Sequence, residues 1–272
     1  MRLPVRALHR ARRGRPAPPP LRADCALFLD IDGTLAEIAA EPHLVRIEKD
    51  VVGLLPRLSR RLGGALALVT GRAITDVDRL LPVHRLPVAG QHGCERRDAE
   101  GTIHLHAPAF ATHARLRALL ADLAARHEGL VLEDKGLTIA LHYRQSPHLA
   151  SHLHQTLRSS LAEVEDAGDY VLQSGKMLVE VRPEARDKGT AIRDFMAEPP
   201  FTGRRAVFVG DDRTDEDGFA VVEDQGGWSI KVGAGRTAAR FRLPDVAAVR
   251  RWLLALPTSE SDMGPVRPLC DG

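Results

Sequence analysis

Residues 25–34 read CALFLDIDGT, a run of five apolar residues that leads directly into two aspartates, a glycine and a threonine. A short continuous apolar run is typical of a strand that is buried on both faces of a parallel sheet. Two further runs end in the same way: residues 65–69 lead into a Thr-Gly-Arg sequence, and residues 206–209 lead into Gly-Asp-Asp. Ligands bind at the carboxyl ends of the strands in such a sheet, so the three segments together predict one shared site.

The elements around these strands predict an α/β protein with a doubly wound, Rossmann-like parallel sheet. Apolar residues at helical spacing predict helices over residues 47–62, 74–81 and 246–256, and residues 230–232 read as a fourth, short strand. Strands that alternate with helices are joined by right-handed crossovers. Pro56 lies inside the first helical pattern and disfavours an unbroken helix there.

The middle of the chain predicts a smaller, inserted domain. Two leucine patterns at helical spacing and four short apolar segments indicate two helices over a small antiparallel sheet. We therefore expect an α/β cap domain at residues 102–182. The core domain would then comprise residues 24–101 and 183–257, with a polar tail at 258–272.

The first 23 residues predict a basic, proline-rich leader. Seven arginines lie within the first 22 residues, and four prolines lie between residues 16 and 20. Because such a composition favours extended chain and offers little apolar surface to bury, we expect this leader to be disordered.

Composition excludes several classes of protein. The formal net charge is +2, but the arginines of the leader conceal a mildly acidic body, and aromatic residues are only 4% of the chain. Both features disfavour nucleic-acid binding. No apolar stretch is long enough to cross a membrane. Three cysteines without a Cys-x-x-Cys pair favour a reducing compartment, so we expect a cytoplasmic protein.

Asp30 and Asp32 form a carboxylate pair that can carry out phosphoryl transfer. Gly33 permits the chain to turn out of the sheet, which lets both side chains face one pocket. Asp30 could attack phosphorus as a nucleophile, while Asp32 protonates the leaving oxygen and later deprotonates a water molecule. A metal ion on Asp30 would keep it ionised while a nearby negative charge raises the proton affinity of Asp32.

A second group of polar residues supplies a metal site and a phosphate site. Residues 210–216 place several carboxylates after the third strand, and oxygen ligands without Cys or His favour Mg²⁺ over Zn²⁺. Thr70, followed by Gly71 at the start of a helix, offers hydroxyl and backbone donors to an oxyanion. Lys188 would neutralise charge on the phosphate and on the nucleophile.

Each of these features also has an ordinary structural explanation. Two aspartates after a strand can form a solvated turn, residues 210–216 can be an acidic loop or a helix cap, and a lysine before a glycine is usually on the surface. Only the convergence of these features on one edge of the sheet favours a catalytic site over these structural explanations.

The four motifs resemble, in chain order, those of the haloacid-dehalogenase-like phosphatases. They are DIDGT at 30–34, TGR at 70–72, Lys188, and GDDRTD at 210–215. Five further stretches are similar to the trehalose-6-phosphate phosphatase family: GQHGCE at 90–95, EDKG at 133–136, HYR at 142–144, GKMLVEVRP at 175–183 and DDRTDE at 211–216. The resemblance extends over residues 24–256.

This resemblance implies a Mg²⁺-dependent phosphatase that hydrolyses trehalose 6-phosphate through an aspartyl-phosphate. It implies Asp30 as nucleophile, Asp32 as general acid and base, and Thr70 and Lys188 as ligands of the phosphoryl group. The implied metal ligands are Asp30, the backbone carbonyl of Asp32, and Asp211, with Asp212 and Asp215 close by. The implied substrate-binding residues are Gly71, Arg72, Glu133, Lys135, Lys176 and Glu180, with His92 and Arg144 as nearby candidates.

Two alternatives stay open. The protein could act on another sugar phosphate, or it could be a non-catalytic sugar-phosphate sensor, although the presence of Asp30 and Asp211 favours an enzyme. The expected partner is a small-molecule sugar phosphate, with a possible functional link to a trehalose-6-phosphate synthase. Gln91 and Cys94 have no role that the sequence assigns.

Overall fold

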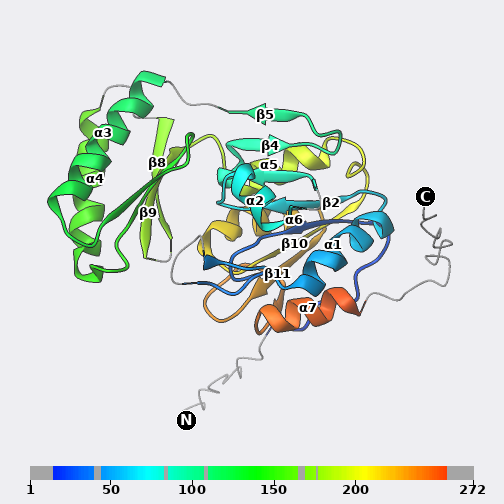
Figure 1. The fold of residues 1–272 in the computed structure, drawn as a ribbon. Helices are drawn as coiled ribbons and strands as arrows, with labels where there is room; N and C mark the ends of the chain where they lie inside the picture. Colours follow the sequence, from blue (N-terminus) through cyan, green and yellow to red (C-terminus); the bar gives the residue numbers. More distant parts are fainter. Residues whose placement is uncertain are drawn as a thin grey trace, which may run out of the picture.

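The computed structural model describes residues 15–39, 44–82, 85–106, 110–164, 169–175 and 177–255. They form an eight-stranded sheet and a separate four-stranded sheet, each with its own helices (Figure 1). The large sheet contains β1 (Cys25–Leu29), β2 (Leu66–Val69), β3 (Val88–Gly90), β4 (Glu95–Arg97), β5 (Ile103–Leu105), β10 (Arg205–Gly210), β11 (Trp228–Val232) and β12 (Phe241–Leu243). Its helices are α1 (Lys49–Arg61), α2 (Ile74–Leu80), α5 (Lys188–Met196), α6 (Glu216–Asp224) and α7 (Val246–Leu254).

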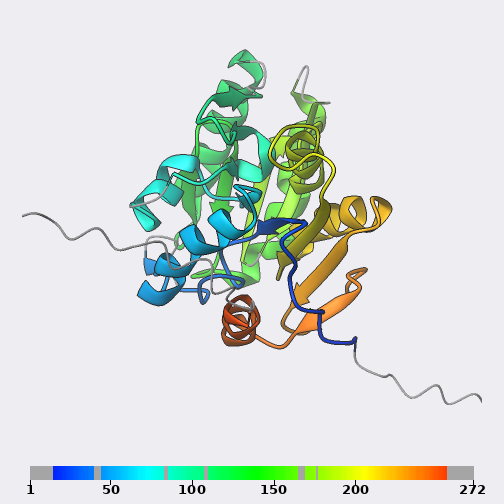
Figure 2. The ribbon, with the colours of Figure 1, turned by 90° about the vertical axis from the view of Figure 1, so that its right-hand side faces the viewer.

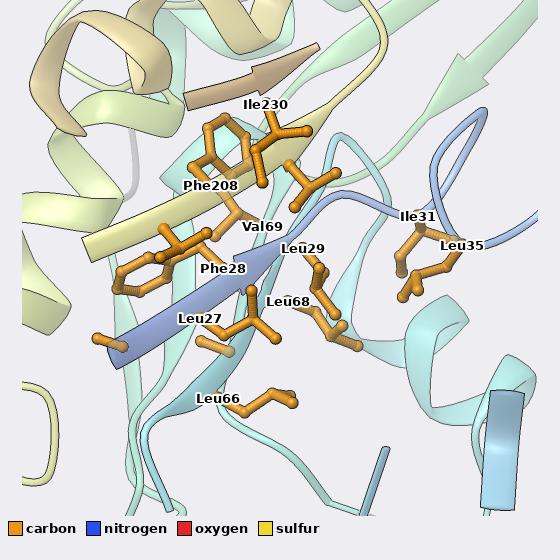
Figure 3. Close-up of a cluster of buried hydrophobic side chains, with 14 of the residues drawn as sticks. Leu27, Phe28, Leu29, Ile31, Leu35, Leu66, Leu68, Val69, Phe208 and Ile230 are labelled. Carbon is orange, nitrogen blue, oxygen red and sulfur yellow. The ribbon is translucent and has the colours of Figure 1, made fainter. Parts of the chain in front are cut away.

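The large sheet has the strand order β12-β11-β10-β1-β2-β3-β4-β5, and β12 through β3 run parallel. Helices α1 and α7 cover one face, and α5 and α6 cover the other (Figures 1 and 2). Because helices lie on both faces, every residue of β1 is buried (Figure 3). The prediction of a doubly wound α/β core is confirmed.

The small sheet forms the cap. It contains β6 (Val131–Asp134), β7 (Ile139–His142), β8 (Tyr170–Gly175) and β9 (Leu178–Pro183) in the antiparallel order β6-β7-β9-β8. Helices α3 (Phe110–Arg126) and α4 (Ala150–Glu163) pack on this sheet around a separate cluster of buried leucines. The two helices and four strands expected for this region are therefore present.

Helix α1 runs through Pro56 without a break, contrary to the expectation from the sequence. A proline inside a helix removes one backbone hydrogen bond. Here the helix is retained because Val51, Leu55 and Leu58 are buried against the core.

Two predicted domain boundaries differ from the structure. Strand β5 pairs with β4 in the core sheet, so the cap starts after residue 105 rather than at residue 102. Residues 15–23 of the expected disordered leader lie against the core, where the carbonyl of Pro16 accepts a hydrogen bond from Arg242 N and that of Pro19 accepts one from Trp252 Nε1. Proline carbonyls remain good acceptors, and Leu21 of the same segment is buried in the hydrophobic core. Residues 1–14 and the predicted tail at 258–272 lie outside the described residues.

No helix among the described residues has the length and apolar character needed to cross a membrane.

Candidate active site

A pocket lies between the cap and the carboxyl ends of β1, β2 and β10. Most of the residues that the sequence singled out line it: Asp30, Asp32, Thr70, Gly71, Arg72, His92, Glu133, Lys135, Arg144, Glu180, Lys188, Asp211 and Asp212. Asp215 lies directly behind the pocket wall, and Lys176 lies outside the described residues. The topology thus brings distant segments of the chain to one site.

Lys188 joins two carboxylates at the base of the pocket. Its Nζ donates to Asp30 Oδ1 at 2.9 Å and to Asp215 Oδ1 at 2.7 Å, and all three side chains are buried. The residue stands at the first position of α5 because Asp187 caps this helix, with its side chain accepting from Thr190 N at 2.6 Å. The capping sequence therefore fixes where the lysine enters the site.

The pKa of Asp30 lies well above its usual range. Burial is the largest cause, since it penalises the charged form, and the neighbouring Asp215 and Asp211 carboxylates add to it against the opposing effect of Lys188. The buried surroundings of Asp30 therefore disfavour its ionised form, and an additional cation would offset this.

Three carboxylates are arranged to hold such a cation. One oxygen from each of Asp30, Asp211 and Asp215 lies within 4.8 Å of the others. The close approach depends on glycines, because a Cβ at Gly33 would lie 2.2 Å from the Asp211 carboxylate and one at Gly210 would lie 2.2 Å from the Asp215 side chain. Hard oxygen donors without Cys or His suit a divalent cation such as Mg²⁺.

Asp32 and Asp212, which were also predicted near the metal, occupy different positions. The carboxylate of Asp32 accepts two hydrogen bonds from Arg72, from Nε and from Nη2, both at 2.6 Å. Asp212 lines the pocket beside the three-carboxylate cluster. Neither side chain belongs to that cluster in the described part of the chain.

Thr70 and Gly71 form the wall of the pocket at the end of β2. Thr70 is buried, and its Oγ1 accepts from Arg72 N at 3.2 Å. A Cβ at Gly71 would lie 2.7 Å from His92 Nε2, so only glycine lets the imidazole approach this loop.

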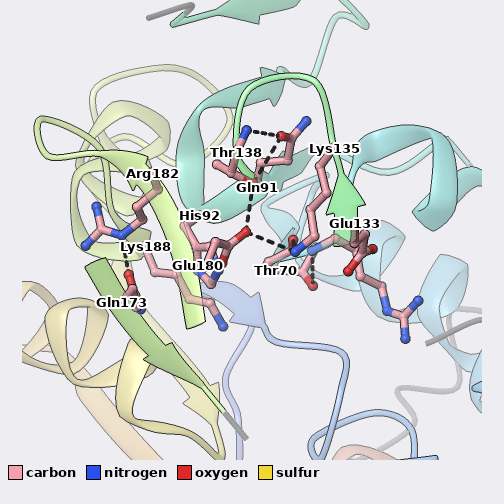
Figure 4. A network of polar contacts seen from close by, with 12 residues as sticks. Thr70, Gln91, His92, Glu133, Lys135, Thr138, Gln173, Glu180, Arg182 and Lys188 are labelled. Carbon is pink, nitrogen blue, oxygen red and sulfur yellow. Dashed lines mark hydrogen bonds and ion pairs between the residues drawn. The ribbon is translucent and has the colours of Figure 1, made fainter. Parts of the chain in front are cut away.

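On the cap side, Glu180 is the centre of a buried polar network (Figure 4). Its Oε2 lies 2.8 Å from His92 Nε2, and its Oε1 accepts from Lys135 Nζ at 3.0 Å and from Thr138 Oγ1 at 2.7 Å. Burial acts to raise the pKa of Glu180, but Lys135, His92 and the hydrogen bonds outweigh it and hold this pKa well below its usual range. Lys135 also donates to the carbonyl of Gly71 at 3.1 Å, so the network spans cap and core.

Glu133 and Arg144 lie further out in the pocket. Glu133 Oε2 lies 2.7 Å from His142 Nε2, whereas Arg144 is exposed at the pocket edge. His142, Thr138 and Gln91 are not among the site residues predicted from the sequence. His142 stands in the HYR stretch near Arg144, and Gln91 stands in the GQHGCE stretch beside His92, so both could have been found there, whereas Thr138 lies in no such stretch.

Comparison with known proteins decides the family. The family model described as trehalose-phosphatase matches residues 28–247. The chain belongs to the trehalose-phosphatase family. The resemblance stated from the motifs is therefore confirmed.

Relatives and solved structures of this family agree with the assignment. The chain is 43% identical over 242 residues to the trehalose-6-phosphate phosphatase of Escherichia coli (strain K12), covering 89% of this chain and 90% of that protein. A bifunctional trehalose-6-phosphate synthase/phosphatase of Thermoproteus tenax is 34% identical over 236 residues, which are 84% of this chain and 31% of that protein. The C-terminal domain of the C. albicans trehalose-6-phosphate phosphatase has the same fold, with a TM-score of 0.77 at 20% identity over 89% of this chain and 98% of that one.

Proposed function

We propose that this member of the trehalose-phosphatase family hydrolyses trehalose 6-phosphate to trehalose and inorganic phosphate. The observation that carries the proposal is the composition of one pocket. Its core side holds Asp30, Lys188 and the neighbouring carboxylates, and its cap side holds the Glu180 network. The first half suits a phosphoryl group, and the second suits sugar hydroxyls that need directed donors and acceptors.

The reaction proceeds in two steps on Asp30. Its carboxylate attacks phosphorus, a bond from Asp30 Oδ to phosphorus forms, and the bond from phosphorus to the sugar oxygen breaks while Asp32 gives that oxygen a proton. A water molecule then attacks the aspartyl-phosphate and loses a proton to Asp32, which releases phosphate and restores Asp30. Thr70 and Lys188 hold the phosphoryl oxygens in both steps.

Asp32 must leave Arg72 before it can act as an acid. Both oxygens of the Asp32 carboxylate accept hydrogen bonds from Arg72, whereas the first step needs one of them to face the leaving oxygen of the sugar. The proposal therefore requires substrate to separate this pair, and Arg72 then becomes available to the substrate. This accounts for the predicted place of Arg72 among the substrate-binding residues.

Mg²⁺ would be held by Asp30, Asp211 and Asp215, with the backbone carbonyl of Asp32 and with Asp212 as further candidates. When bound, the ion supplies positive charge that favours ionised Asp30 and stabilises negative charge on the phosphoryl group.

The distal sugar would be bound by the cap. Glu133, Lys135 and Glu180 would hydrogen-bond its hydroxyls, together with His92 and Arg144, and the role predicted for Lys176 stays an expectation. A functional link to an enzyme that makes trehalose 6-phosphate, and a place in the cytoplasm, complete the proposal. The buried thiols of Cys25 and Cys94 are compatible with a reducing compartment.

The test compares phosphate release from trehalose 6-phosphate, sucrose 6-phosphate and glucose 6-phosphate, each with and without a chelator. We expect trehalose 6-phosphate to be hydrolysed fastest and the chelator to abolish turnover. Equal turnover of all three, or none of the first, would overturn the substrate assignment in favour of another sugar phosphate. A non-catalytic sensor would release phosphate from none of them and would form no beryllium fluoride adduct on Asp30.

A further inference from the structure

The short turn that follows β3 has an unusual backbone. Gln91 and His92 have φ values of 46° and 57°, in the left-handed region that non-glycine residues rarely adopt, and Gly93 follows at 95°. Such residues are strained and persist only where their surroundings hold them. Here Gln91 N donates to the carbonyl of Arg72 at 2.9 Å, and His92 N donates to that of Thr70 at 3.0 Å.

This turn directs the side chain of Gln91 out of the core and into the cap (Figure 4). The side-chain carbonyl, Oε1, accepts hydrogen bonds from two consecutive backbone groups of the cap, Leu137 N at 3.1 Å and Thr138 N at 3.0 Å. Gln91 is only 2% exposed. Its Nε2 donates at 2.9 Å to Glu95 Oε1, which also accepts from Ile74 N at 2.8 Å, so the amide is held from both ends.

The two amides belong to the turn between β6 and β7, and that turn carries Lys135. The turn is closed by a hydrogen bond from Lys135 N to the carbonyl of Thr138 at 3.0 Å. Lys135 then extends into the pocket to Glu180 and to the carbonyl of Gly71. Without Gln91, Leu137 N and Thr138 N would lose their acceptor at the core surface, and a buried donor without a partner is unfavourable.

We propose that Gln91 is a positioning residue that anchors the β6–β7 turn to the core and thereby fixes Lys135 in the sugar half of the pocket. Gln91 does not touch the reacting atoms. It acts on binding of the sugar by holding the cap segment that contacts it. The kinetic consequence rests on the proposed function, whereas the anchoring itself does not.

The first experiment measures hydrogen exchange in the substrate-free, full-length protein. Gln91→Met removes the acceptor at similar size. Gln91→Asn keeps an amide, and asparagine tolerates the left-handed backbone, but it is one methylene too short to reach the turn. We expect the amides of Leu137 and Thr138 to exchange about tenfold faster or more in both variants, while those of β7 stay slow and show that the cap is folded. Gln155→Met, at an exposed position of α4, is the matched control and should exchange as the unaltered protein does.

The second experiment compares trehalose 6-phosphate with p-nitrophenyl phosphate, which has no sugar for the cap to bind. In both Gln91 variants we expect KM for trehalose 6-phosphate to rise about tenfold, with kcat/KM for p-nitrophenyl phosphate within about twofold of the unaltered protein.

Unchanged exchange of the Leu137 and Thr138 amides in both variants would overturn the anchor. Faster exchange with an unchanged KM, or an equal loss of activity on both substrates, would overturn the positioning role. If the unaltered protein does not hydrolyse trehalose 6-phosphate, the proposed function fails, while the exchange experiment still decides whether Gln91 anchors the turn.

Discussion

Asp30 on the core side of the pocket and Glu180 on its cap side are both buried carboxylates, and each accepts a hydrogen bond from a lysine. Their pKa values are nevertheless shifted in opposite directions, upward for Asp30 and downward for Glu180. Burial acts upward on both. The difference comes from the neighbours, since Asp30 faces two further carboxylates and Glu180 faces Lys135, His92 and the hydroxyl of Thr138.

The two halves of the pocket therefore differ in whether their carboxylates need a ligand to balance their charge. Both carboxylate oxygens of Glu180 have hydrogen-bond partners without any ligand, so this carboxylate is held in place as a fixed group on the cap side of the pocket. The carboxylates around Asp30 are close together and buried, so the core half is stabilised further by added positive charge. In the proposed function, a phosphate ester and its cation would meet the core half of the pocket, and the sugar would meet the cap half.

The largest effect is expected for Asp30→Asn. Removal of the nucleophile should lower phosphate release about 10⁴-fold or more. The melting temperature in chelator should not fall, because the amide removes a charge that burial and the Asp215 and Asp211 carboxylates disfavour. Phosphate release and calorimetry measure the two quantities, with Asp122→Asn, at an exposed position of α3, as the matched control. Retained turnover would assign the nucleophile to another residue.

Lys188→Met tests the core half of the pocket by removing the positive charge of the lysine side chain. We expect kcat/KM to fall about 10²–10³-fold for every phosphate ester, because in the proposed function the lysine would hold the phosphoryl group common to all of them. Leaving Asp30 and Asp215 without this ammonium group should also cost about 3–5 kcal/mol of unfolding free energy in chelator.

Urea denaturation of this variant with and without Mg²⁺ sharpens the test. The added ion should restore part of the lost stability, since it supplies positive charge to the same carboxylates, and Lys49→Met at an exposed position should show neither effect. A loss restricted to trehalose 6-phosphate would move Lys188 out of the phosphate half.

Replacing a lysine of the cap in the same way, with Lys135→Met, should affect the two substrates differently from Lys188→Met. We expect KM for trehalose 6-phosphate to rise about 10–30-fold, with p-nitrophenyl phosphate turned over within about twofold of the unaltered rate. The reason is that Lys135 contacts Glu180 and a core carbonyl and lies outside the carboxylate cluster. Steady-state kinetics on both substrates measures this, and an equal loss on the two would place Lys135 in the phosphate chemistry.

The core half of the pocket could be predicted from the residues alone, whereas the cap half could not. Asp30, Thr70 and Asp211 each follow an apolar run directly, so the topology of a parallel sheet already brings them together. The cap residues were reached only through resemblance to a family. Gln91 lies in one of the family-like stretches, but its role was missed because a side-chain carbonyl that binds the backbone of a distant turn leaves no pattern in the sequence. Thr138 lies outside those stretches.

The fold, too, could be predicted from the sequence only in part. The long apolar strands were predicted, but β4 reads Glu-Arg-Arg and has the composition of a surface segment. It is nevertheless largely buried, because Arg96 forms two hydrogen bonds to Glu198 and Arg97 forms two to Asp78. Such pairing joins residues as far as 102 positions apart, and it cannot be read from local periodicity.

The smallest expected effect is the dependence of stability on pH in the cap half, tested with Glu180→Gln. Because the folded protein lowers the pKa of Glu180, its ionised form stabilises the fold above the unfolded value of about 4.3, and this contribution is lost as the pH falls below that value. At pH 7 the free energy of unfolding of the variant should therefore be about 1–3 kcal/mol lower than that of the unaltered protein. This gap should narrow as the pH falls below about 5. Urea denaturation across this range measures the gap, with Glu128→Gln at an exposed position as the matched control. A gap that stays constant with pH would mean that Glu180 contributes through packing and hydrogen bonds alone, and the electrostatic contrast between the two halves would then be wrong.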